Sequence, residues 1–275
     1  MADQFELWNT VVGDAWVEHA DHFDRALAPF GEAVFDRLGI TAEDRVVDIG
    51  CGVGATTLRL GERAASVLGV DVSDTMLEGA RARARGVDNV RFLAHDVDAA
   101  SFATAEFDVA FSRFGIMFFE DPVVAFGHIR SALVDGGRLG FVAFSSPFDN
   151  PFMLAPVMAA AAHVPMVLPS DATAPGPFSL ADPARIEFVL AAAGFGEISV
   201  VAGPDRMVVG PADDLPALAL RSLEQNPGIA PGLAAAEPDV RAAAITAAAD
   251  VFAGHVVAGQ VVMAAGTWIA TATAR

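Results

Sequence analysis

Apolar and polar positions follow two different periods along this chain and divide it into alternating strands and helices. Segments beginning at Thr56, Asp74 and Pro122 carry apolar residues at helical spacing. Between them lie short, continuous apolar runs, which are typical of buried parallel strands. These runs cover residues 46–49, 67–70, 90–93, 109–111 and 139–144. Such alternation predicts a parallel sheet with helices packed on it.

The ends of the chain extend this pattern. Residues 1–40 have apolar positions at helical spacing and are expected to be helical. After residue 144 the pattern is less regular, and a proline-rich loop is expected over 165–177. The other expected elements are a helix from Phe152, a helix over Ser179–Ala193, strands at 198–201, 207–209 and 261–270, and helices over 212–256.

The predicted fold class is α/β, with a Rossmann-like, seven-stranded, mostly parallel sheet flanked by helices. Residues 1–40 are expected to form an N-terminal helical lid, and 41–145 a cofactor-binding core. Residues 146–275 are expected to complete the sheet, with a helical insertion at about 212–256 before the last strand that covers the substrate.

Composition agrees with one large core. The chain has 275 residues, of which 53% are hydrophobic, enough for one to two domains. Acidic residues in the first segment exclude a signal peptide there, so a soluble, cytoplasmic protein is expected. The single cysteine, Cys51, cannot form an internal disulfide, and no metal site is expected.

Charge narrows the class of partner. Thirty-five acidic residues against seventeen basic ones give a net charge of -18, and the basic residues are scattered. Nucleic acid would be repelled by this charge, so a small-molecule substrate is expected instead. The sequence leaves a homo-oligomer open.

The most informative segment is a strand that runs into a glycine-rich turn. Residues 46–54 read Val-Val-Asp-Ile-Gly-Cys-Gly-Val-Gly, and a second apolar strand ends at Asp71. Glycines allow the backbone to approach a ligand closely, and an acid at the tip of the next strand can accept ribose hydroxyls. The pattern predicts a cofactor that contains a nucleoside.

The spacing of the glycines favours one kind of nucleoside cofactor. Gly50, Gly52 and Gly54 follow G-x-G-x-G, which departs from the G-x-x-G ending of a pyrophosphate-binding turn. Asp48, two residues before the first glycine, would repel a pyrophosphate and attract a cationic ligand. A nicotinamide-dependent oxidoreductase therefore stays as the disfavoured alternative.

Residues 48–54 and 69–77 resemble the first two motifs of class I S-adenosylmethionine-dependent methyltransferases. Later segments also fit: His95-Asp96-Val97 after the third strand, Phe107 to Arg113 as the fourth strand, and Leu133 to Val142 as the loop and fifth strand. The resemblance covers about residues 30–145. Within the family, the chain is most similar to the small-molecule branch that includes quinone C-methyltransferases.

The resemblance implies a cofactor, S-adenosyl-L-methionine, and roles for individual residues. The glycine turn, with Asp48, would lie against the methionine and ribose, and Asp71 would hold the ribose hydroxyls. Other residues are implied to contact the adenine, the methionine ammonium or the lid side of the cofactor. They are Val72 and Met76 on the adenine, Asp96 and Val97 at its amino group, the Ser112 backbone at the ammonium, and Trp16 in a lid with Trp8, Asn9 and Val17.

Residues for the methyl acceptor are expected after the fourth strand and in the cover. Arg113 would bind a substrate carboxylate or pair with one of the many acids, and Phe114 would form an apolar wall. His163 is the histidine placed nearest to a substrate. A lone histidine is more often structural, and no catalytic residue is assigned.

The function predicted from the sequence is methyl transfer from S-adenosylmethionine to a carbon, oxygen or nitrogen of a small, largely apolar metabolite or natural product. Two alternatives from other classes are the nicotinamide-dependent oxidoreductase and a non-catalytic cofactor-binding module.

Overall fold

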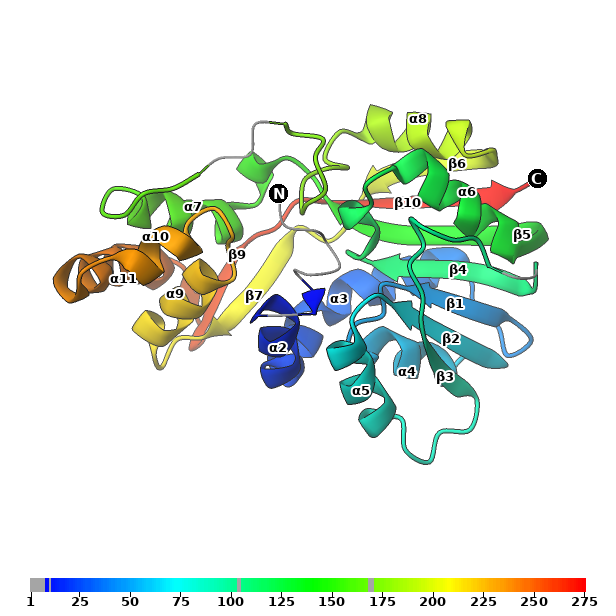
Figure 1. Ribbon diagram of the computed structural model, residues 1–275, viewed down its shortest axis with the longest axis horizontal. Coiled ribbons are helices and arrows are strands. Elements are labelled where there is room, and N and C mark those ends of the chain that lie inside the picture. Colours follow the sequence, from blue (N-terminus) through cyan, green and yellow to red (C-terminus); the bar gives the residue numbers. More distant parts are fainter. Residues whose placement is uncertain (1–7, 10, 103–104, 168–170) are drawn as a thin grey trace. The chain divides into compact units, whose positions relative to one another are not determined.

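Seven strands form one sheet in the order β3-β2-β1-β4-β5-β10-β6, in which β10 runs opposite to the other six. The computed structural model describes residues 8–9, 11–102, 105–167 and 171–275 (Figure 1). The sheet confirms the expected fold class. Its strands are β1 (Arg45–Ile49), β2 (Ser66–Asp71), β3 (Val90–Ala94), β4 (Phe107–Arg113), β5 (Leu133–Phe144), β6 (Phe195–Ala202) and β10 (Thr267–Ala274).

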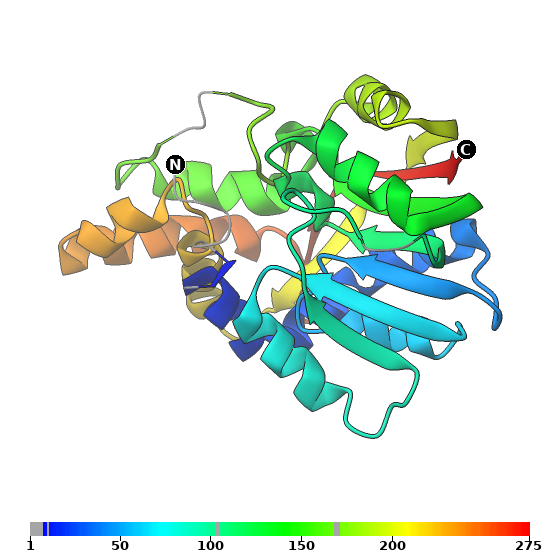
Figure 2. The same ribbon diagram turned by 45° about the vertical axis from the view of Figure 1, so that its right-hand side comes forward.

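Helices cover both faces of this sheet. A side chain at Gly140 of β5 would collide with Leu38 of α3, whereas the next residue, Phe141, packs its ring on Phe126 of α6. Because neighbouring residues of a strand point to opposite faces, α3 and α6 lie on opposite sides (Figures 1 and 2). The helices in the same part of the chain are α2 (Val11–Glu18), α3 (Ala20–Leu38), α4 (Ala55–Gly61), α5 (Asp74–Arg83), η1 (Ile116–Phe118), α6 (Pro122–Ala132) and α8 (Pro183–Ala192).

The chain divides into two compact units. Unit 1 contains the sheet and comprises Met1–Phe144, Pro175–Pro204 and Thr267–Arg275; unit 2 comprises Ser145–Ala174 and Asp205–Gly266. The segment 146–275, expected as one part, is therefore shared between both units. Unit 2 contains the expected insertion 212–256 within Asp205–Gly266, together with a separate segment, Ser145–Ala174.

Unit 2 has its own core and its own sheet. Strands β7, β9 and β8 pair in that order, and apolar side chains including Leu223, Ile229 and Phe252 are fully buried. Three helices occupy the stretch expected to be helical. The elements are η2 (Pro147–Asp149), α7 (Pro151–Ala160), β7 (Arg206–Pro211), α9 (Leu215–Glu224), α10 (Ala230–Ala235), α11 (Pro238–Ala253), β8 (Val256–Val257) and β9 (Gln260–Ala264).

One expected strand was wrong. Residues 261–270 form two strands, β9 and β10, which belong to different sheets and different units. The chain turns at Gly266, where a Cβ would lie only 2.4 Å from the Ser145 hydroxyl, and the Gly266 N–H donates to the Asp149 carbonyl. Asn150, fully buried, also donates to the Gly266 carbonyl. This packing, which periodicity does not reveal, ends the first strand.

Smaller differences concern element ends. The helix expected over Ser179–Ala193 begins at Pro183, because Asp182 accepts a hydrogen bond from the Ala184 N–H and caps it. Strand β5 begins at Leu133 and includes a register shift, so the expected loop before it is part of the strand. Residues 1–7 and 10 of the expected lid, and 168–170 of the expected loop, lie outside the described residues.

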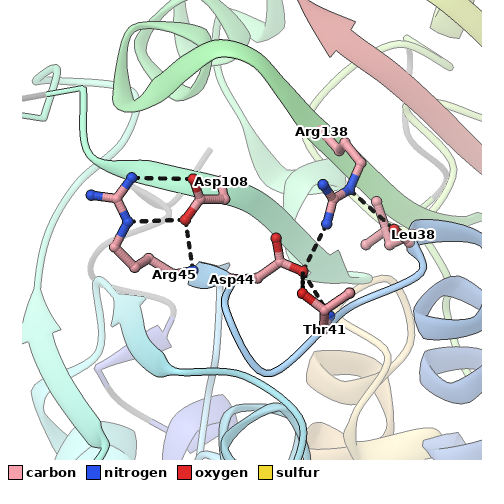
Figure 3. A network of polar contacts seen from close by, with 6 residues as sticks. All are labelled: Leu38, Thr41, Asp44, Arg45, Asp108 and Arg138. Atoms are coloured by element: carbon pink, nitrogen blue, oxygen red, sulfur yellow. Dashed lines mark hydrogen bonds and ion pairs between the residues drawn. The ribbon is translucent and has the colours of Figure 1, made fainter.

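A polar network closes the sheet at the end opposite the glycine turn (Figure 3). Asp44, nearly buried, accepts hydrogen bonds from the Thr41 N–H at 2.7 Å and from Arg138 at 2.8 Å. Arg138 also donates to the Leu38 carbonyl at the end of α3. Beside it, Arg45 and Asp108 form an exposed bidentate pair, which lowers the pKa of Asp108.

We expect Asp44→Ala to lower the free energy of unfolding by about 2 kcal/mol, because Arg138 and the Thr41 N–H lose a buried, charged acceptor. Arg45→Gln should have a much smaller effect, since that pair is solvated. Urea denaturation of both variants measures the difference. Equal effects would contradict the structural role given to Asp44.

Candidate functional site

The order of the sheet reverses between β1 and β4, and ligands of open α/β sheets bind beyond the carboxyl ends of strands at such a point. The glycine turn follows β1 at this place. Gly50, Gly52 and Gly54 all adopt positive φ angles, of 66°, 53° and 81°. L residues with side chains rarely adopt this backbone conformation, so the turn requires glycine at these positions.

The turn also touches the tip of β4 without any side chain between them. A Cβ on Gly50 would lie 2.9 Å from the Cα of Gly115, and a Cβ on Gly115 would lie 2.9 Å from the Cα of Gly50. Ser112, fully buried, donates its hydroxyl to the Ile49 carbonyl at 2.7 Å. The two strand tips are thus held in direct backbone contact.

Phe114 creates the sharp turn that makes this contact. Its φ angle of 63° is unusual for a bulky residue and costs about 1 to 3 kcal/mol. The ring is buried, stacked on Phe144 at 4.1 Å and edge-on to Phe30 at 5.5 Å. This aromatic packing offsets the strain and fixes the backbone on both sides of Phe114.

Asp71 lies at the tip of β2, beside the glycine turn. One carboxylate oxygen accepts the Gly52 N–H at 2.8 Å and the other accepts the Ser73 N–H at 2.9 Å. Burial raises the pKa of Asp71, against the opposing effect of these N–H groups. Because a carboxylate has about four acceptor positions, both oxygens can accept further hydrogen bonds.

Asp48 is fully buried beneath the turn, on β1. Its Oδ2 atom accepts the hydroxyls of Thr56 and Thr57, both at 2.7 Å, from the first turn of α4. Its Oδ1 atom has no hydrogen-bond partner among the described residues. Burial raises the pKa of Asp48 to about 6, although the two threonines and Arg113 act in the opposite direction.

A shallow pocket of about 190 Å³ lies at the tips of β2 and β3. Asp96 is exposed there, and its Oδ1 atom accepts the N–H groups of Asp98 and Ala99. The neighbouring Val97 is buried, and its carbonyl accepts a hydrogen bond from the His128 ring at 2.7 Å. The pocket is lined by Val72, Asp74, Ala94, His95 and Asp96.

Comparison with known proteins agrees with this geometry. Residues 46–137, which contain the turn and both acids, match the family described as methyltransferase domain. This part of the chain is similar to methyltransferases, and the likeness supports the expected cofactor, S-adenosylmethionine.

Two curated relatives show the extent of the likeness. Aklanonic acid methyltransferase DauC of Streptomyces sp. (strain C5) is 31% identical over 50% of this chain and 64% of its own length. Demethylmenaquinone methyltransferase of Corynebacterium kroppenstedtii is 34% identical over 42% of this chain and 48% of its own length. The matches therefore span about half to two thirds of these relatives.

Solved structures share the fold over more of the chain. The YcgJ protein of Bacillus subtilis has a TM-score of 0.58 at 20% identity and covers 89% of this chain and 97% of its own. A geranyl diphosphate methyltransferase solved with GPP and sinefungin has a TM-score of 0.51 at 20% identity, covering 89% and 76%. No helix among the described residues is long and apolar enough to cross a membrane.

The residues at the turn fit the expected cofactor in three respects. The turn leaves no room for a Cβ at Gly50, Asp71 keeps free acceptor positions, and one carboxylate oxygen of Asp48 has no partner among the described residues. Met76 is buried against the turn, with its sulfur 3.7 Å from the position of a Cβ on Gly52. Val72 and Asp96 both line the pocket, and their contact with adenine stays a prediction.

The N-terminal segment is hydrogen-bonded to the tip of β2. Asn9 donates to the Val72 carbonyl at 3.1 Å and accepts the Asp74 N–H at 2.9 Å. Ser73 donates its hydroxyl to the Trp8 carbonyl at 2.8 Å. The Trp8 ring also packs edge-on against Phe118, beyond β4, at 5.0 Å. This segment therefore links the two strand tips between which the cofactor is expected.

Two expected contacts have other partners in the structure. Trp16 stacks on Phe23 at 4.1 Å and stands edge-on to Trp8, so its ring packs within the N-terminal segment. Phe114 is held in the core by other aromatic rings. A direct contact of Trp16 with cofactor, or of Phe114 with an acceptor, stays a prediction.

His163 belongs to unit 2, where its side chain is exposed and its N–H donates to the Ala160 carbonyl after α7. Its role toward an acceptor stays a prediction. No group of three or more metal-ligating side chains occurs in the part of the chain that the structure describes.

Sequence reasoning missed several residues of the site. Thr56 and Thr57 donate to one oxygen of Asp48, and the only sequence signal for them is their place directly after the glycine turn. Gly115 closely approaches Gly50, and nothing in the sequence around Gly115 predicts this contact. His128 is partly buried, and its ring donates to the Val97 carbonyl. Cys51 is buried with a raised pKa, in agreement with a packing role.

We expect the stability of the ligand-free protein to depend on pH through Asp48. Its pKa is raised from 3.8 to about 6, so the folded state holds the proton more tightly than the unfolded state. Stability should therefore fall as pH rises from about 4 to 6, by up to about 3 kcal/mol relative to Asp48→Asn.

Urea denaturation at pH 4.5 and 7.5, of the wild type and Asp48→Asn, measures this difference. Asp36→Asn, at an exposed position of α3, is the matched control and should show no such change. A constant difference between wild type and Asp48→Asn at the two pH values would contradict the burial of a titrating Asp48.

Proposed function

We propose that the protein transfers the methyl group of S-adenosylmethionine to a carbon, oxygen or nitrogen of a small, largely apolar metabolite. The observation that carries this proposal is the buried Asp48 beneath the glycine turn, with one oxygen unpartnered. An anionic pyrophosphate at this turn would face a buried carboxylate, whereas a cationic amino acid end would be attracted to it.

Different site residues would hold different parts of the cofactor. Asp71 would accept hydrogen bonds from the ribose hydroxyls, and Val72 and Asp96 would hold the adenine at the pocket that they line, with the buried Met76 beside the turn. The turn from Gly50 to Gly54, with Asp48 and the Ser112 backbone, would hold the ribose and the methionine. Val97 and the N-terminal segment support this arrangement from the sides.

The chemistry of the cofactor explains why no acid–base dyad is assigned. When bound, S-adenosylmethionine supplies an electrophilic methyl group, and its leaving group is a neutral thioether. The protein then contributes mainly by holding the acceptor in line with this methyl group and by excluding water. A rigid β4 tip, fixed by Phe114 and Gly115, supports such positioning.

The relatives support the class of acceptor. Their names refer to aklanonic acid and demethylmenaquinone, and a structural neighbour was solved with GPP. We infer that the acceptor of this protein is likewise a small, largely apolar molecule. The net charge of -18 argues against nucleic acid as the substrate. A cytoplasmic location is part of this proposal.

Isothermal calorimetry with S-adenosylmethionine, S-adenosylhomocysteine and NAD tests the proposal. Binding of the first two without NAD is the expected result. Binding of NAD alone would contradict the assignment of the turn and of Asp48, and would favour an oxidoreductase.

Asp71→Ala should weaken cofactor binding by one or two charge-assisted hydrogen bonds, each worth roughly 1.5 to 3 kcal/mol. Asp36→Ala, an exposed change on α3, should leave the affinity unchanged. Calorimetry with S-adenosylhomocysteine measures both. An unchanged affinity for Asp71→Ala would show that this acid does not hold the ribose.

A further inference from the structure

Arg113 is a partly buried cation that lacks a bonded anion. It ends β4, and no hydrogen bond or ion pair joins its guanidinium to any residue that the structure describes. A guanidinium has five N–H donors and stays charged in proteins. Leaving such a group without partners away from bulk water is costly, so its retention at this place points to a ligand.

The position of Arg113 is fixed by two neighbours of the glycine turn. A Cβ on Gly31 of α3 would lie 3.5 Å from Cδ of Arg113 and 3.6 Å from the methyl group of Thr56. Thr56 is the residue that donates to Asp48. The Arg113 side chain therefore lies between β4, α3 and the first turn of α4, immediately beside Asp48.

The charges around Arg113 do not neutralise it. Asp24 and Asp48 attract it and Arg83 repels it. Asp24 already forms an ion pair with Arg83, whose guanidinium also donates to the Val53 carbonyl in the turn. Asp48 interacts with Arg113 electrostatically but is within ion-pair distance of no cation among the described residues. Arg113 and Asp48 thus lie close together, and among the described residues neither the guanidinium donors nor the Asp48 Oδ1 atom has a hydrogen-bond partner.

This pair is complementary to a zwitterion. We propose that Arg113 binds the α-carboxylate of the methionine end of the cofactor, on the side of Asp48, which attracts the α-ammonium. The inference rests on the proposed function and narrows it, because Arg113 then belongs to the cofactor site. A substrate carboxylate, the first alternative raised by its sequence position, is not needed to explain the residue.

The backbone supports this role for Arg113. The strained Phe114 follows it directly, and its aromatic packing holds the end of β4 in one conformation. The guanidinium is therefore positioned before a ligand arrives. A planar fork in a fixed position suits a carboxylate better than the flexible ammonium of lysine would.

Ligands that lack parts of the methionine end test the inference. S-adenosylhomocysteine contains both the carboxylate and the ammonium, whereas 5′-methylthioadenosine contains neither. For Arg113→Gln, calorimetry should show an affinity for S-adenosylhomocysteine that is roughly 10- to 100-fold weaker, and an affinity for 5′-methylthioadenosine that is unchanged. Arg45→Gln, at the opposite end of the sheet, is the matched control and should change neither.

A second measurement needs no variant. Wild-type protein should bind decarboxylated S-adenosylmethionine, which keeps the ammonium, at least roughly 10-fold more weakly than S-adenosylmethionine.

The variant Arg113→Lys keeps the charge without the planar fork. Its affinity for S-adenosylhomocysteine should fall between those of wild type and Arg113→Gln.

The outcomes separate this inference from the proposed function. If wild type binds S-adenosylhomocysteine and Arg113→Gln binds it equally well, the inference is wrong and the proposed function stands. An equal loss for both nucleosides would give Arg113 a structural role only. If wild type binds neither nucleoside, the proposed function itself fails, and this inference with it.

Discussion

The site depends on one backbone contact, between the turn after β1 and the tip of β4. Gly50 and Gly115 approach so closely that neither position can carry a side chain. The contact requires a left-handed conformation at Gly50 and at Phe114, and the second of these is strained. Aromatic packing of Phe114 on Phe144 and Phe30 stabilises the strained turn. The fold thus tolerates local backbone strain at Phe114, which holds the strand tips in a fixed geometry.

This contact explains the electrostatics of the site. With the two tips joined, Asp48 is enclosed beneath them and shares its buried surroundings with Arg113. Burial disfavours both charges, which raises the pKa of Asp48 and lowers that of Arg113. A ligand that carries an anion and a cation side by side would compensate both. The buried charges of Asp48 and Arg113 are therefore suited to bind the amino acid end of a cofactor.

The sequence predicted the sheet and the main acids, because these depend on local patterns. Continuous apolar runs identify β1 to β5, and the glycine spacing identifies the turn. The division of residues 261–270 was not predictable, since it depends on the crowding of Gly266 by Ser145 and Asp149 from elsewhere in the chain. For the same reason the sequence could not reveal Gly115 as an approach point, nor show that Trp16 packs on Phe23. That Arg113 has no bonded partner among the described residues depends on three separate elements and is visible only in the folded chain.

A crystal structure of the protein with S-adenosylhomocysteine tests the account most directly. The account predicts adenine at the Val72 and Asp96 pocket, ribose hydroxyls on the Asp71 carboxylate, and the amino acid end beside Asp48 and Arg113. A ligand bound elsewhere, or one bound at the turn with its amino acid end directed away from both Asp48 and Arg113, would contradict it.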